Sequence, residues 1–92
     1  MSEHSKQTTK KIIETLDLPQ DLFLGVPNIS LSGNKEVYIS NHRGILSYGK
    51  EEMLILAKEF QIHVKGKNLD IISYSKEDLT IQGYISAVEF IL

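Results

Sequence analysis

The chain has 92 residues, a formal net charge of −2, 41% hydrophobic residues, and neither cysteine nor tryptophan. This length allows one domain with a small core. Because small secreted domains are usually held by disulfides, the lack of cysteine favours a reducing, cytoplasmic compartment. Nucleic-acid binding is not expected, since it relies on a basic surface. No stretch predicts a signal peptide or a transmembrane helix.

The N-terminal part predicts a polar leader followed by one short helix. Residues 1–7 are polar and charged, and we expect them to be disordered. The stretch TTKKIIETLDLPQD predicts a helix at about residues 8–17, which Thr8 or Thr9 can cap and Pro19 ends. Three apolar residues share one face of this helix: Ile12, Ile13 and Leu16.

From residue 28 onward the pattern is β throughout. Apolar residues alternate with polar ones most regularly at Phe60, Ile62 and Val64, which is the period of a strand with one buried face. The segment MLILAKEF also suits a helical turn, but its hairpin-like flanks favour a strand. Eight short apolar runs are separated by turn residues: 28–32, 36–40, 44–48, 52–58, 60–65, 69–71, 79–82 and 84–92. We therefore predict an all-β, antiparallel, sandwich-like fold of about eight strands, in a single domain over residues 8–92.

Two segments of the second half resemble each other. VKGKNLDII at residues 64–72 and TIQGYISAV at residues 80–88 both place a glycine between apolar alternations. Two copies are too few to predict a solenoid, which needs at least three stacked repeats.

The stretch ISNHRGILSY, residues 39–48, carries the most chemistry-bearing side chains. Asn41 and Gly44 tolerate positive φ, so a four-residue hairpin turn accounts for both. A turn does not require His42 or Arg43, since Asp, Lys or Ser would serve there. The arginine offers a planar fork for carboxylate or phosphate, and the histidine can donate and accept hydrogen bonds. Three interpretations stay open, namely a plain turn, a protein-contact tip, or a ligand or catalytic site. The plain turn is the simplest of them, and for His42 and Arg43 we favour a contact over a catalytic pair.

Other candidate sites are weaker. His63 lies between two apolar residues and is expected on the solvated face of its strand, and His4 lies in the leader. Three scattered histidines without cysteine make a poor metal set, and no nucleophile motif or phosphate-binding loop is present. We therefore predict no catalytic residue, no cofactor and no metal. Four tyrosines are spaced through the predicted strands: Tyr38, Tyr48, Tyr74 and Tyr84. They could stack the bases of a single-stranded nucleic acid, although packing at the edge of the core is the commoner use of tyrosine in a sheet.

The order of several segments resembles a known family. LDLPQD, VPNISLSGNKEVYISNHRGIL, IHVKGKNLDI and LTIQGYISAVEF follow one another between about residues 16 and 91. In this order they are similar to the YabP/YqfC family of sporulation proteins, and most similar to the YqfC branch. The tetrad Asn41, His42, Arg43 and Gly44 belongs to the family motif.

The resemblance implies a non-enzymatic protein made in the mother cell during late endospore development. It carries no catalytic residue over to this chain. It implies a compact, sandwich-like β domain and, as a partner, a YqfD-like membrane protein or other sporulation proteins. We expect a cytoplasmic protein, peripheral at most at the membrane that engulfs the forespore.

Three hypotheses for the function follow. The first is an assembly or adaptor module that acts by protein contacts through residues 41–44 and self-associates, most simply as a dimer, because edge strands can pair and a small core gains stability. The second is a peripheral membrane or anionic-ligand binding module that uses the N-terminal helix and Arg43. The third, an enzyme using His42 and Arg43, needs a pocket that brings a second titratable group to the turn.

Overall fold

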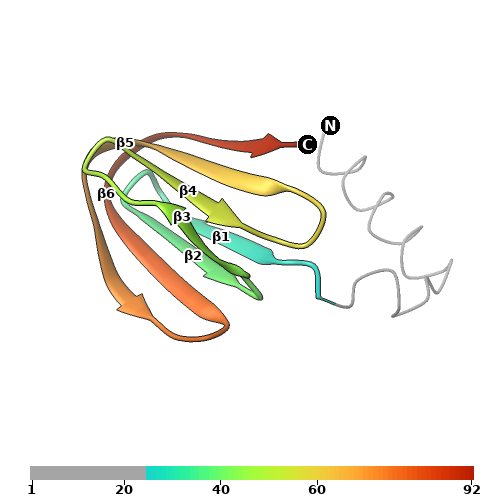
Figure 1. Ribbon diagram of the computed structural model, residues 1–92. Coiled ribbons are helices and arrows are strands. Elements are labelled where there is room, and N and C mark those ends of the chain that lie inside the picture. The colour runs from blue at the N-terminus through green and yellow to red at the C-terminus, as the bar shows by residue number, and fades with distance from the viewer. Residues whose placement is uncertain (1–24) are drawn as a thin grey trace, which may run out of the picture.

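The computed structural model describes residues 25–92, which form one antiparallel sheet of six strands (Figure 1). The strands are β1 (Asn28–Ser32), β2 (Glu36–Ser40), β3 (Gly44–Ser47), β4 (Glu52–Leu56), β5 (Gln61–Tyr74) and β6 (Asp78–Ile91). Their order across the sheet is β1-β2-β6-β5-β4-β3. The all-β, antiparallel prediction is confirmed. The leader expected at residues 1–7 and the helix expected at about residues 8–17 lie outside the described residues.

The described residues contain six strands where the sequence pattern indicated eight. The runs at 60–65 and 69–71 both belong to β5, and the runs at 79–82 and 84–92 both belong to β6. Gly66 and Gly83 were expected in turns, but they lie inside these 14-residue strands, at or next to irregularities of the β5–β6 pairing. A glycine that permits a turn also permits a bulge, so composition does not distinguish the two.

The long strands bend at these glycines, and the sheet thereby becomes two layers (Figure 1). The first half of β6 pairs with β2 and the second half of β5, whereas the second half of β6 pairs only with the first half of β5, which β4 flanks. A Cβ on Gly66 would overlap the carbonyl oxygen of Tyr84, and one on Gly83 would lie 2.8 Å from the carbonyl oxygen of Asn68. The two strands approach so closely there that only glycine fits.

The same arrangement occurs twice around this bend. The turn after β1 accepts hydrogen bonds through the carbonyls of Lys35 and Asn34, from the amides of Gly83 and Ile85. The loop after β3 accepts two hydrogen bonds from β5 in the same way. The amide of Gly66 donates to the carbonyl of Glu51, and the amide of Leu69 donates to that of Lys50. The sequence echo between residues 64–72 and 80–88 therefore marks the two strands that bend side by side, each covered by a hairpin.

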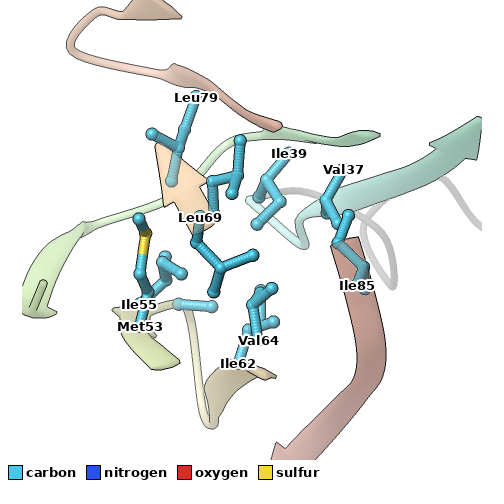
Figure 2. Close-up of a cluster of buried hydrophobic side chains, with 11 residues drawn as sticks. Val37, Ile39, Met53, Ile55, Ile62, Val64, Leu69, Leu79 and Ile85 are labelled. Atoms are coloured by element: carbon cyan, nitrogen blue, oxygen red, sulfur yellow. The ribbon is translucent and has the colours of Figure 1, made fainter. Parts of the chain in front are cut away.

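The core lies between the two layers. Alternate residues of β2 (Val37, Ile39) and β4 (Met53, Ile55) are buried, as a strand with one solvated face requires. Ile62, Val64, Leu69, Leu79, Ala57, Ile81 and Ile85 complete the buried set. Figure 2 shows these side chains converging from both layers. MLILAKEF begins in β4 and contains no helix, which confirms the strand interpretation.

Candidate interaction site

The Asn41–Gly44 segment is a connection between the two layers and not a hairpin turn. β2 pairs with β1 and β6, whereas β3 pairs with β4, so the two strands that flank the segment are not neighbours in the sheet. The amide of His42 donates to the carbonyl of Glu77, and the amide of Arg43 donates to that of Leu56 at 2.7 Å. The hairpin prediction is wrong because local turn chemistry does not reveal which strands pair.

The backbone explanation for the two outer residues of the segment is confirmed. Asn41 has a φ of 63° and Gly44 a φ of 137°, both in the range that favours asparagine and glycine. The side-chain amide of Asn41 also donates to the carbonyl oxygen of Val26 at 3.2 Å. This hydrogen bond ties the segment to the chain just before β1.

His42 is buried and structural. The residue is 4% exposed, and its ring centroid lies 5.3 Å from that of Tyr74. The amide of Gly44 donates to Nδ1 at 3.0 Å, while Nε2 lies 2.9 Å from the carbonyl oxygen of Ser75. Because Nδ1 accepts, the ring proton belongs on Nε2, which donates to Ser75. The imidazole thus joins the connection to the β5–β6 turn, and it presents no open ring nitrogen to a substrate.

Arg43 is the exposed member of the tetrad. With its neighbours it lines a surface hollow of about 420 Å³, to which the end of β5 contributes Tyr74 and the β5–β6 turn contributes Lys76 and Glu77. A side chain at position 25 would touch the guanidinium of Arg43 and the stem of Lys58, so both cations lie beside Gly25. The hollow therefore combines two cations, Arg43 and Lys76, with one carboxylate and one exposed aromatic ring, and Lys58 lies beside it at Gly25.

The turn residues of this hollow were not singled out from the sequence. In the sequence, Glu77 is one more charged residue in a turn region, and Tyr74 is one of four strand tyrosines. No signal in the sequence places them beside Arg43, because 31 or more positions separate them and the contact depends on the order of strands in the sheet.

The other expected features have local partners. His63 lies on the outer face of β5, as expected, but it is flanked by Glu52 at 2.7 Å and Glu89 at 3.5 Å. The four tyrosines do not share one open face: Tyr48 donates to Asp70, Tyr84 lies under the ammonium of Lys35, Tyr74 packs on His42, and Asp78 accepts from Tyr38. That hydrogen bond raises the pKa of Tyr38 above its usual value of 10.0.

Residues 25–92 contain no group of three or more His, Asp or Glu side chains that could hold a metal ion. In the same part of the chain, no helix is long and apolar enough to cross a bilayer.

Comparison with known proteins agrees with the family resemblance. The model of the YabP family matches residues 25–91, which is nearly all of the described part of the chain. Among curated proteins, the chain is 28% identical over 91 residues to "Uncharacterized protein YqfC" of Bacillus subtilis (strain 168), covering 99% of this chain and 98% of that protein. No solved structure matches.

Proposed function

Since the chain belongs to the YabP family, we propose that it is a non-enzymatic sporulation protein that acts as an assembly or adaptor module in the mother cell. Protein contacts during late endospore development are its mode of action. A YqfD-like membrane protein, or another sporulation protein, is the expected partner. The module also associates with a second copy of itself.

One observation carries this proposal: a buried histidine holds an exposed arginine in a fixed place. The two ring nitrogens of His42 bind both the connection itself and the β5–β6 turn. Arg43 follows directly on this anchor and is exposed at the hollow. Because the backbone is fixed before any partner arrives, less conformational entropy is lost on binding. Arginine on such a scaffold is typical of a contact residue in an interface.

A count of heat-resistant spores tests this role. A strain that lacks the protein is complemented with the wild type, with Arg43→Ala, or with Lys67→Ala, which removes an exposed cation from a distant part of β5. We expect deletion to lower the count, and we expect Arg43→Ala to fail where Lys67→Ala succeeds. Equal rescue by both variants would exclude Arg43 as a required contact. Full spore counts after deletion would contradict the sporulation role.

The mixed charge of the hollow favours a polypeptide over a phosphate group. Glu77 lies among the lining residues beside Arg43 and Lys76, and a carboxylate there opposes an anion. A partner surface that offers both an acidic and a basic side chain satisfies both signs.

A second candidate is a peripheral membrane or anionic-ligand binding module, supported by the cations beside Gly25. Arg43 and Lys58 lie next to this residue, where the described chain begins. Flotation with anionic vesicles tests the idea. The membrane module would be favoured if the wild type co-floats at low salt, and if this co-flotation is lost both at high salt and on Arg43→Ala. Absence of co-flotation of the wild type would exclude it.

A further inference from the structure

Four strand edges are open among residues 25–92, and they differ in how well they are protected. β1 and β3 are the outermost strands of the sheet. The second half of β5 extends past β4, and the second half of β6 extends past β2, so each of them leaves one more unpaired edge. Natural sheets discourage pairing at such edges with charges, bulges or short strands. The edge that lacks these devices is the candidate surface for a second chain.

Three of the edges carry a protective feature. The second half of β6 carries Glu89 on its open edge, a charge of the kind that discourages pairing with another strand. The second half of β5 is interrupted by irregular pairing on both sides of Ile71. The four-residue β3 has a register shift between Ile45 and Ser47.

β1 is also short, but it carries neither a charge nor a bulge. Its sequence, NISLS, is uncharged, and its pairing with β2 runs without a register shift over all five residues. Pro27 precedes the strand and lies outside that ladder. Leu31 is 56% exposed although its cross-strand partner, Val37, belongs to the core. β1 is therefore a regular edge with an uncovered apolar side chain on the inner face.

The backbone of β1 is also correctly oriented for a second strand. The carbonyl of Lys35 accepts from the amide of Gly83 in β6. Because backbone groups alternate along a strand, the odd-numbered residues of β2 direct theirs to β6 and the even-numbered residues direct theirs to β1. By this alternation Tyr38 hydrogen-bonds with Ser30, its partner in the register. The amides and carbonyls of Ile29 and Leu31 consequently point away from β2, toward the open side.

We propose that β1 pairs antiparallel with β1 of a second copy, with the two-fold axis at Ser30. This inference rests on the proposed self-association and names the surface for it. Ile29 then lies opposite Leu31 of the second copy, and the free backbone groups of both residues form the new hydrogen bonds. The apolar inner layer continues across the interface, while Asn28, Ser30 and Ser32 meet on the polar outer face.

The interface is small, so the dimer is weak. Five residues from each copy fall far short of the roughly 20–30 residues a side of a stable interface. A dimer of this size populates at high micromolar concentration or when a partner holds two copies together.

Cross-linking through an introduced cysteine tests the axis, because the chain has no cysteine of its own. Ser30→Cys places two sulfurs at a non-hydrogen-bonded pair, whose Cα separation of about 4.5 Å suits a disulfide. Asn28→Cys and Ser32→Cys are the matched controls, since like positions there are roughly 14 Å apart along the strands. At high micromolar concentration in a thiol–disulfide buffer, we expect at least tenfold more covalent dimer from Ser30→Cys than from either control. Equal yields would overturn the proposal.

Charge complementation provides a second test that needs no covalent bond. Ser30→Lys and Ser30→Glu each bring like charges together at the axis, and each should weaken the dimer at least tenfold in sedimentation equilibrium. Mixing the two variants should restore association, since opposite charges then face each other. A wild-type monomer at high micromolar concentration, or a dimer that neither variant weakens, would refute the β1 interface.

The two proposals can fail separately. If Arg43→Ala loses spores while Ser30→Cys does not cross-link, the adaptor role stands and the β1 dimer falls. If Ser30→Cys cross-links while Arg43→Ala restores all spores, the dimer stands and the Arg43 contact falls.

Discussion

Removal of the His42 imidazole should destabilise the domain by about 2–4 kcal/mol. The ring is buried and holds two backbone groups, the amide of Gly44 and the carbonyl of Ser75. Its replacement by alanine leaves both groups without this partner in the interior of the connection. The substitution therefore tests whether His42 acts as a structural anchor.

The magnitude follows from the contacts that are lost. A buried donor or acceptor left unsatisfied costs about 1–3 kcal/mol, and the lower end applies here because both hydrogen bonds are only partly buried. The two together contribute about 2 kcal/mol. Lost packing against Tyr74, whose ring centroid is 5.3 Å away, adds roughly 1 kcal/mol or more. This sum is a large share of the 5–15 kcal/mol that stabilises an ordinary domain.

Urea denaturation followed by circular dichroism measures this loss as a lower midpoint at an unchanged slope. His42→Phe keeps a ring beside Tyr74 but offers no hydrogen bond, so it should retain the packing part and lose the other. His63→Ala is the control, because that histidine lies on the outer face with exposed carboxylate partners. A loss below 0.5 kcal/mol for His42→Ala, on the order of a neutral surface substitution, would refute the anchor.

Three further predictions follow from the sheet. Gly66→Ala should destabilise the fold by several kcal/mol or prevent folding, because the new methyl group overlaps a backbone carbonyl of β6. Gly33→Ala is the comparison: nothing lies within 4 Å of its new methyl group, and its φ of 55° adds backbone strain of only about 1–2 kcal/mol. Equal urea midpoints for the two variants would contradict the close approach at Gly66. Tyr38 should titrate above its usual pKa of 10.0 in ultraviolet absorbance, and Asp78→Asn should lower that pKa again. Because the folded pKa is the higher one, the stabilisation by this hydrogen bond is present below about pH 10 and is lost as the pH rises through the raised value. His63 and its 2.7 Å partner Glu52 should show a coupling of about 0–1 kcal/mol in a double-mutant cycle, as pairs near the surface do. A coupling of 3 kcal/mol would contradict the solvent screening.

Local patterning was sufficient for the parts of the fold that depend on neighbours in the chain. The alternation around Ile62 and Val64 identifies a half-buried strand, and both side chains are fully buried. Asparagine and glycine at positions 41 and 44 indicate the two places where the backbone takes positive φ. These features arise from side-chain alternation and from steric limits on φ, which act over two or three residues.

The sequence by itself therefore determined the β class, the buried face of the strand around Ile62 and Val64, and the two positive-φ positions in the connection before β3. Only the tertiary structure decided that β2 and β3 belong to different layers, that two glycines bend long strands, and that His42 is buried beside the β5–β6 turn. The physical reason is the range of the interactions. Strand order and the hollow around Arg43 result from hydrogen bonds and packing between residues dozens of positions apart, and those depend on how the whole sheet closes over its core.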